Sequence, residues 1–335
     1  MSRQFIPVVL CVDVEPDKPF NHRSSPMPWE GYQRGVEWAT EFRTELQCLS
    51  AAPVHLSWFY RMDPQVETLH GDPGWAISNY RDSFEALQRA GDEAGLHVHP
   101  FRWSDTADSW IQDYGNQDWV EHSVRMAFDS FRQETGRDCV SFRFGDRWMN
   151  NRTFRLLESL GVRHDMTLEP GSRKMPSYHG NKPYTGFIPD QRKVPQHIYR
   201  PAKNDYRRSD ASRTNAPFVM PVSTAPIHLA SKKVYRKPAA CAWPFHRLFN
   251  RQRVSHWTHT LNIAAEPAVF RSVLGHQLQT LRSNYLVMPS RAHIFTSTEF
   301  VDNACTNLRS LFADYGDRSF VFTTPAGALA CLGED

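Results

Sequence analysis

Short apolar runs alternate along the chain with longer amphipathic segments. The short runs are rich in β-branched and aromatic residues, which is typical of buried strands. The longer segments repeat apolar residues at helical spacing. The predicted strands are residues 6–14, 54–60, 95–101, 139–145, 162–168, 216–223, 291–297 and 319–324. The predicted helices are residues 36–50, 79–95, 118–136, 151–161, 267–284 and 300–316. Because strand and helix alternate, we predict an α/β fold with parallel strand pairing.

A chain of 335 residues fits either two ordinary domains or one large α/β barrel. No linker of disordered composition separates the predicted strands, and neither an internal repeat nor a low-complexity tract is present. We therefore predict a single domain over residues 1–335, a distorted (β/α) barrel with about seven parallel strands. Irregular insertions are expected near residues 172–215, which are rich in Pro, Gly and Arg, and near residues 230–260.

Charge and composition narrow the function classes. The 39 basic and 36 acidic residues leave a net charge of +3, which gives no overall drive toward nucleic acid. The N-terminal apolar run meets Asp13 and Glu15 too early for a secretory signal, and no segment approaches the ~20 apolar residues of a membrane span. Six scattered cysteines lack metal or redox spacing, so we expect reduced thiols and a cytoplasmic location. The basic, aromatic run 232–257 is either a solvated insertion or a peripheral contact with an anionic membrane.

The stretch GLHVHPF, residues 95–101, holds two histidines one residue apart. Residues i and i+2 of a strand point to the same face, so His97 and His99 are expected to project together. A single histidine in such a run is more often a hydrogen-bonded core residue than a ligand. Two histidines at the carboxyl end of a barrel strand are about as typical of a ligand-binding site as of core packing.

The first predicted strand ends in VDVEPD, which places Asp13 and Glu15 on one face before Pro16 stops the ladder. Two imidazoles and one carboxylate form a three-ligand site with an open position, which suits zinc or another divalent metal. The second carboxylate would then be free to act as a base on water. Alternatively, both carboxylates are solvated or cap the following loop, although carboxylates ending so apolar a strand need partners.

With these motifs, the chain resembles the polysaccharide deacetylases of carbohydrate esterase family 4, the NodB-homology proteins, and within them a WalW-like branch implicated in cell-wall synthesis. The resemblance rests on VDVEPD, EAGLHVHP, FRFGDRWMNNRTFRLLESLG and VRHDMTLEPG, in that order along the chain. It implies the following roles: Asp13 is the general base, Glu15, His97 and His99 are the metal ligands, and Arg143 with Asp165 orients the base. Arg143 and Asp165 could equally be a structural ion pair between neighbouring strands.

Two departures from the family pattern stand out. Relatives usually separate their two histidines by three or more residues, whereas one residue separates them here. Relatives also carry a general-acid histidine on a late strand, where this chain has Thr296. His293 lies on the opposite face of the predicted strand from Thr296, and His228 would come from another strand. Without either histidine, leaving-group protonation would lose about 10²- to 10⁴-fold in rate.

The expected activity is a metal-dependent N-deacetylase that removes an acetyl or related acyl group from an amino sugar of a glycan or glycan precursor. The arginine motif adds Arg147 and Trp148 as substrate-binding candidates, together with Trp103. Tryptophans near the loops could stack on sugar rings, although core packing is the commoner role for any one of Trp29, Trp58, Trp103, Trp110 and Trp148. Two alternatives remain open: a metal-dependent phosphoesterase on a similar barrel, and a glycan-binding relative with weak or no activity.

Overall fold

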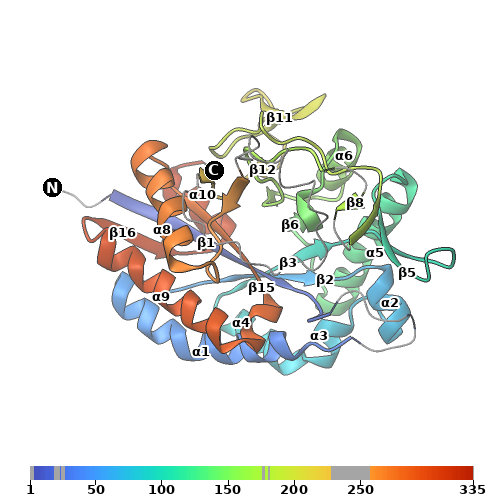
Figure 1. The fold of residues 1–335 in the computed structure, drawn as a ribbon, viewed down its shortest axis with the longest axis horizontal. Coiled ribbons are helices and arrows are strands. Elements are labelled where there is room, and N and C mark those ends of the chain that lie inside the picture. Colours follow the sequence, from blue (N-terminus) through green and yellow to red (C-terminus); the bar gives the residue numbers. More distant parts are fainter. Residues whose placement is uncertain are drawn as a thin grey trace, which may run out of the picture.

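The computed structural model describes residues 4–18, 23, 27–175, 178–179, 182–227 and 257–334. One parallel sheet forms the centre of the molecule (Figure 1), with the strand order β12-β7-β6-β3-β2-β1-β15 and with β16 also paired to β1. Its strands are β1 (Gln4–Val14), β2 (Ser57–Arg61), β3 (Glu93–Val98), β6 (Ser141–Phe144), β7 (His164–Asp165), β12 (Phe218–Val219), β15 (Leu286–Arg291) and β16 (Arg318–Phe322).

The sheet curls into a half-barrel. The segment after β12 approaches the other edge of the sheet, where the Ser223 amide donates to the Val287 carbonyl of β15 at 3.0 Å. The predicted (β/α) barrel with about seven parallel strands is thus confirmed. No described helix is long and apolar enough to cross a membrane.

Helices cover the outside of the sheet, and Figure 1 shows α1, α4 and α9 along one side of it. The helices are α1 (Glu30–Ser50), α2 (Pro64–His70), α3 (Trp75–Asn79), α4 (Arg81–Arg89), α5 (Gln117–Thr135), α6 (Asn151–Ser159), α8 (Pro267–Gly275), α9 (Thr298–Asp314) and α10 (Pro325–Leu332). Capping residues in the local sequence set where these helices begin and end. Asn116 accepts a hydrogen bond from the Trp119 amide at the start of α5, and Gly136 ends that helix with φ +67°.

Alternate residues of β1 enter two different cores. From β1, Val8, Leu10 and Val12 pack outward against the helices, while Val9 and Cys11 point into the barrel. Period-2 alternation then places Asp13 and Glu15 on the inner side at the carboxyl end of β1. Helix α10 contributes Ala328 and Leu329 to the inner cluster.

Shorter strands lie outside the central sheet. Strands β4 (Phe101–Ser104), β5 (Ser109–Asp113), β9 (Lys182–Thr185) and β8 (Tyr178–His179) form a second sheet, and β10 (Pro201–Ala202) pairs with β11 (Asp205–Ser209). Strand β13 (Thr224–Ile227) pairs with β14 (Trp257–Thr260). Residues 228–256 lie outside the described residues, so the predicted insertion near 230–260 and the basic run 232–257 largely stay predictions.

Among the predicted boundaries that differ from the structure, two concern the strands that carry site residues, β15 and β3. The strand predicted over 291–297 ends at Arg291, and a 3₁₀ turn, η4 (Ala292–Thr296), follows it. Its apolar residues resemble a strand, but Phe295 packs on Trp38 of α1 with ring centroids 4.9 Å apart. The helix predicted over 79–95 ends at Arg89, because Gly91 takes φ +82° and β3 begins two residues later.

Candidate active site

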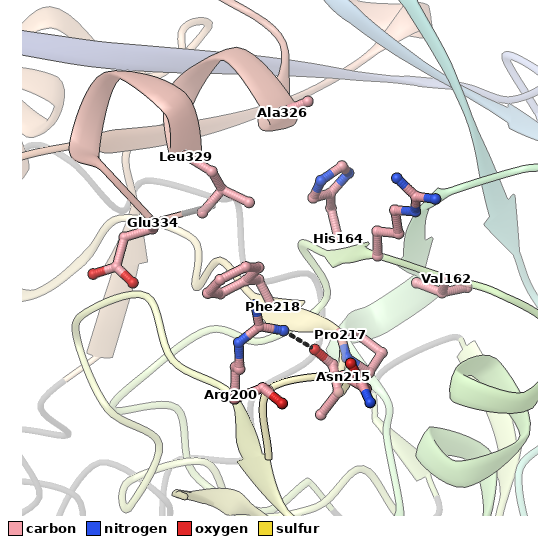
Figure 2. A pocket seen from close by; sticks show the side chains of 12 residues that line it. Val162, His164, Arg200, Asn215, Pro217, Phe218, Ala326, Leu329 and Glu334 are labelled. Atoms are coloured by element: carbon pink, nitrogen blue, oxygen red, sulfur yellow. Dashed lines mark hydrogen bonds between the residues drawn. The ribbon is translucent and has the colours of Figure 1, made fainter. Parts of the chain in front are cut away.

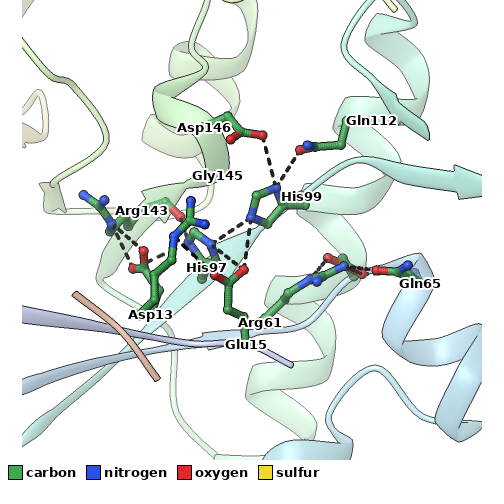
Figure 3. Close-up of polar contacts among 12 residues, drawn as sticks. Asp13, Glu15, Arg61, Gln65, His97, His99, Gln112, Arg143, Gly145 and Asp146 are labelled. Atoms are coloured by element: carbon green, nitrogen blue, oxygen red, sulfur yellow. Dashed lines mark hydrogen bonds and ion pairs between the residues drawn. The ribbon is translucent and has the colours of Figure 1, made fainter. Parts of the chain in front are cut away.

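The predicted ligands meet at the carboxyl ends of β1 and β3, on the inner side of the barrel (Figure 3). His97 lies on β3 and His99 follows its end, and their Nε2 atoms are 3.0 Å apart. Glu15 Oε2 lies 3.9 Å from the first of these nitrogens and 3.6 Å from the second. One ligand atom from each residue falls within 4.8 Å of the other two, and all three side chains are buried.

Hydrogen bonds at the far side of each ring fix the imidazole orientations. His97 Nδ1 is 3.0 Å from the Arg143 carbonyl oxygen, which can only accept, so Nδ1 carries the hydrogen. His99 Nδ1 is 2.7 Å from Gln112 Oε1 and donates to it in the same way. In the neutral rings both Nε2 lone pairs therefore face one another and Glu15. A cation between them removes the repulsion between these lone pairs, so the donor set fits a metal ion.

The electrostatics favour the same protonation states. Burial lowers the pKa of His97 to about 4, so the imidazole is neutral at pH 7. Burial acts to raise the pKa of Glu15, but the Arg291 guanidinium and the two imidazoles bring this pKa well below its usual range. A neutral imidazole and an ionised carboxylate are the forms that bind zinc.

A strained turn after β6 supports His99. A Cβ on Gly145 would clash with the His99 ring, so only glycine lets the imidazole lie against this turn. The next two residues, Asp146 and Arg147, both have positive φ, 49° and 54°. Such backbone is costly for residues other than glycine and is concentrated at functional sites. Here it brings Asp146 Oδ2 to 3.9 Å from His99 Nδ1.

Asp13 is held by Arg143 directly. The Arg143 Nε atom donates to both carboxylate oxygens, at 2.9 and 3.1 Å, and Nη1 donates to the Met166 carbonyl at 2.7 Å. Asp13 and Arg143 are both buried. A guanidinium so placed fixes the orientation of the carboxylate through charge-assisted hydrogen bonds.

The expected pairing of Arg143 with Asp165 is not formed among the described residues. Asp165 is opposite Phe142 in the sheet register, so its side chain shares the face of Phe142, whereas Arg143 is on the inner face. Asp165 instead accepts a hydrogen bond from Thr167 Oγ1 at 2.6 Å, and its Oδ2 has no partner within the described chain. Burial raises the pKa of Asp165 to about 7.

A cavity of about 470 Å³ reaches the site. Its polar side includes Asp13, Arg143 and Arg291, and its apolar side includes Val269 and Phe300. The three candidate ligands are buried beside this cavity and do not line it. Water or substrate in the cavity therefore meets Asp13 and its arginine neighbours first.

The remaining sequence candidates fall in different places. Trp148 is buried and stacks on Tyr114, with ring centroids 5.3 Å apart, which is core packing. Trp103 on β4 is partly exposed, with the Arg23 guanidinium 5.8 Å from its ring centroid. Arg147 is half-buried and lies 3.9 Å from Glu169. The other tryptophans near the loops are buried: Trp29, Trp58 and Trp110.

The structure also distinguishes the residues considered for the general-acid position, which are Thr296, His293 and His228. Thr296 is exposed, and its hydroxyl donates to the His293 carbonyl at 2.8 Å. His293 lines the cavity that holds Asp13. The parity argument that opposed these two residues fails, because they lie in the 3₁₀ turn η4 and not in a strand. His228 lies outside the described residues.

Sequence reasoning missed Arg291 and Gln112. Arg291 ends β15 opposite Asp13 in the register, and its Nε is 3.3 Å from Glu15 Oε1. The misplaced boundary of this strand hid its position at the carboxyl end. Gln112 comes from β5, a hairpin strand whose short polar sequence, SWIQD, carries little strand signal.

A second cavity, of about 380 Å³, lies at the amino ends of β7 and β12, near α10 (Figure 2). His164 and Phe218 begin those two strands and line it together with Arg200. Barrel enzymes place their chemistry at the carboxyl ends of the strands, which is where the histidines and carboxylates gather here.

No family model and no curated protein matches the sequence. Solved structures do match in fold. A probable polysaccharide deacetylase from Pseudomonas aeruginosa PAO1 aligns over 99% of this chain and 92% of its own, with 12% identity and a TM-score of 0.53. The fold is the one found in polysaccharide deacetylases. PuuE allantoinase aligns over 98% and 90% at 11% identity (TM-score 0.52), and a glycoside hydrolase/deacetylase from Parabacteroides distasonis over 96% and 70% at 8% identity (TM-score 0.53).

Proposed function

We propose that the protein is a metal-dependent N-deacetylase of the carbohydrate esterase family 4 type, acting on an amino sugar of a glycan or glycan precursor. The convergence of two imidazole Nε2 atoms and a carboxylate, beside a carboxylate held by arginine, carries this proposal. Structures sharing the fold include proteins named as polysaccharide deacetylases, which supports the choice of substrate class. The WalW-like branch, the cytoplasmic location and peripheral membrane contact stay predictions.

Glu15, His97 and His99 would hold the metal, with zinc preferred for this donor set. When bound, zinc would supply a Lewis acid for amide hydrolysis. Asp13 faces the cavity and accepts the proton of the attacking water. Arg143 orients Asp13 through two hydrogen bonds, a task that needs no help from Asp165.

His293 is the histidine we assign to leaving-group protonation. It lines the same cavity as Asp13, whereas Thr296, at the position expected from the family, is exposed and bonded to backbone. An amide nitrogen must gain a proton to leave, and a histidine near neutral pH is the usual donor. Trp103, which is partly exposed on β4, and Arg147 on the strained turn are proposed to contact the sugar.

Metal analysis of the purified protein with the Glu15→Ala and His97→Ala variants tests the site. We expect close to one equivalent of zinc in the native protein and little in either variant. Glu41→Ala, an exposed position on α1, serves as the matched control. Retention of a full equivalent by both site variants would rule out this metal centre.

Two substrates separate the proposed activity from its alternatives. The deacetylase should release acetate from an acetylated chitooligosaccharide and leave a nitrophenyl phosphate intact. Cleavage of the phosphate alone would instead identify a phosphoesterase. Binding of zinc and the oligosaccharide without acetate release would identify a glycan-binding protein.

A further inference from the structure

Arg291 places a fixed positive charge between the candidate metal ligands and the cavity. It is the last residue of β15 and lies opposite Asp13 in the register, so both side chains are on the inner face of the barrel. Its Nε is 3.3 Å from Glu15 Oε1, while the other oxygen of Glu15 faces the imidazoles. An arginine guanidinium is always charged in proteins, so Arg291 brings a permanent positive charge to this position.

Most of the guanidinium donors remain available to a ligand. Arg291 lines the 470 Å³ cavity, and 40% of its side chain is exposed. A guanidinium has five N–H donors, and within the described residues the ion pair with Glu15 is the one polar contact that Arg291 makes. If Arg291 served only to position Glu15, its guanidinium would not need to be exposed to the cavity.

The cavity wall opposite the strand ends supplies further neutral polar groups. Thr260 and Asn262 line it from the end of β14 and the turn after it, together with His259. Burial lowers the pKa of His259. These groups suit sugar hydroxyls, whereas Arg291 is suited to an anion.

We propose that Arg291 binds a carboxylate of the substrate, so that the preferred substrate is an N-acylated amino sugar carrying a uronic acid group. Arginine binds carboxylates through two parallel hydrogen bonds. Glu15 contacts Arg291, and Asp13 and Glu169 line the same cavity, so a singly charged carboxylate meets less repulsion there than a doubly charged phosphate. This inference rests on the proposed function.

Binding of glucuronate and glucose, which differ only at C6 and carry no amide, tests Arg291 without catalysis. Calorimetry on zinc-saturated protein should show glucuronate bound at least tenfold more tightly than glucose. Arg291→Gln should abolish this preference, and Arg291→Lys should restore part of it. Arg309→Gln is the matched control, because Arg309 forms an exposed ion pair with Glu45 on the outer surface and should keep the full preference.

Equal binding of the two sugars by the native protein, or a preference that survives in Arg291→Gln, would overturn the inference. Acetate release from N-acetylglucosamine and N-acetylglucosaminuronate separates this failure from that of the proposed function. Release from both at equal rates would reject the role of Arg291 but keep the deacetylase. A preference for glucuronate without acetate release from any acetylated sugar would keep the role of Arg291 but reject the deacetylase.

Discussion

Single residues decide whether the donor atoms converge, and Gly145 is the clearest case. A side chain at this position would occupy the space of the His99 ring. We therefore expect Gly145→Ala to displace His99 and to lower zinc affinity at least tenfold, as measured by competition with a chelating dye. Gly275→Ala in α8 is the control, because its Cβ would meet only the Tyr315 hydroxyl, at 3.5 Å. Equal zinc affinity in both variants would show that His99 is not a ligand.

The Arg143–Asp13 pair is the second residue-scale test. Removing one partner of a buried ion pair leaves an uncompensated charge and typically costs about 3–5 kcal/mol. Arg143→Met should lose about this much stability to urea unfolding, and Arg143→Met combined with Asp13→Asn should recover a large part of it. Additive losses in the double variant would mean that the two groups do not interact. Both variants should lack deacetylase activity.

At the scale of elements, β3, β6 and β7 share a titrating cluster at their amino ends. Ser141 donates to Glu93, and Ser141 Oγ is 2.9 Å from His164 Nδ1. Burial raises the pKa of Glu93 to about 7 and lowers the pKa of His164 to about 4. The folded protein therefore keeps the Glu93 proton that the unfolded chain releases near pH 4.5, and this contribution to stability falls as pH rises to about 7. The lowered pKa of His164 has the opposite effect, because its contribution to stability rises as the pH increases from about 4 to 6.5.

Comparing Glu93→Gln with the native protein isolates the first of these two effects. As the pH rises from 4 to 8, the stability of the variant relative to the native protein should increase by about 1–3 kcal/mol. This increase should be complete above pH 7. Urea unfolding across this range measures it. Glu85→Gln, on the exposed face of α4, should give a difference that does not vary in this way. A flat difference for Glu93→Gln would contradict a raised pKa.

The Asn307 side chain of helix α9 holds part of one wall of the cavity. Asn307 Nδ2 donates to the carbonyls of Ile263 and Ala265, at 2.7 and 2.8 Å, in the segment that carries Asn262. Asn307→Ala should cost about 1–3 kcal/mol and raise KM more than it lowers kcat, because it loosens the wall and leaves the candidate ligands in place. Thr306→Ala, exposed on the same helix, is the control. An unchanged KM would mean that this wall does not contact substrate.

Most central elements could be predicted because their apolar periodicity is strong, as in β1 and α5. The elements that sequence reasoning missed or misplaced are those in which tertiary contacts outweigh local pattern. Phe295 lies in a 3₁₀ turn because it packs on Trp38, and Gln112 lies in a polar hairpin strand. The period-2 rule brought Glu15 and the two histidines together correctly. It could not give the strand register, and the register decides that Arg143 contacts Asp13 and not Asp165.

For the whole molecule, the proposed metal joins two strands that are far apart in the sequence. Glu15 follows the end of β1, and His97 and His99 lie at and just after the end of β3, so a ligand bound to all three is bound by the folded chain and not by the unfolded one. Such binding stabilises the fold by about 2.7 kcal/mol when free zinc is 100 times its Kd. We therefore expect zinc to raise Tm by a few degrees and EDTA to reverse the increase. Glu15→Ala should abolish this response and Glu41→Ala should keep it. A zinc response that persists in Glu15→Ala would place the stabilising ion elsewhere and remove the basis of the proposed mechanism.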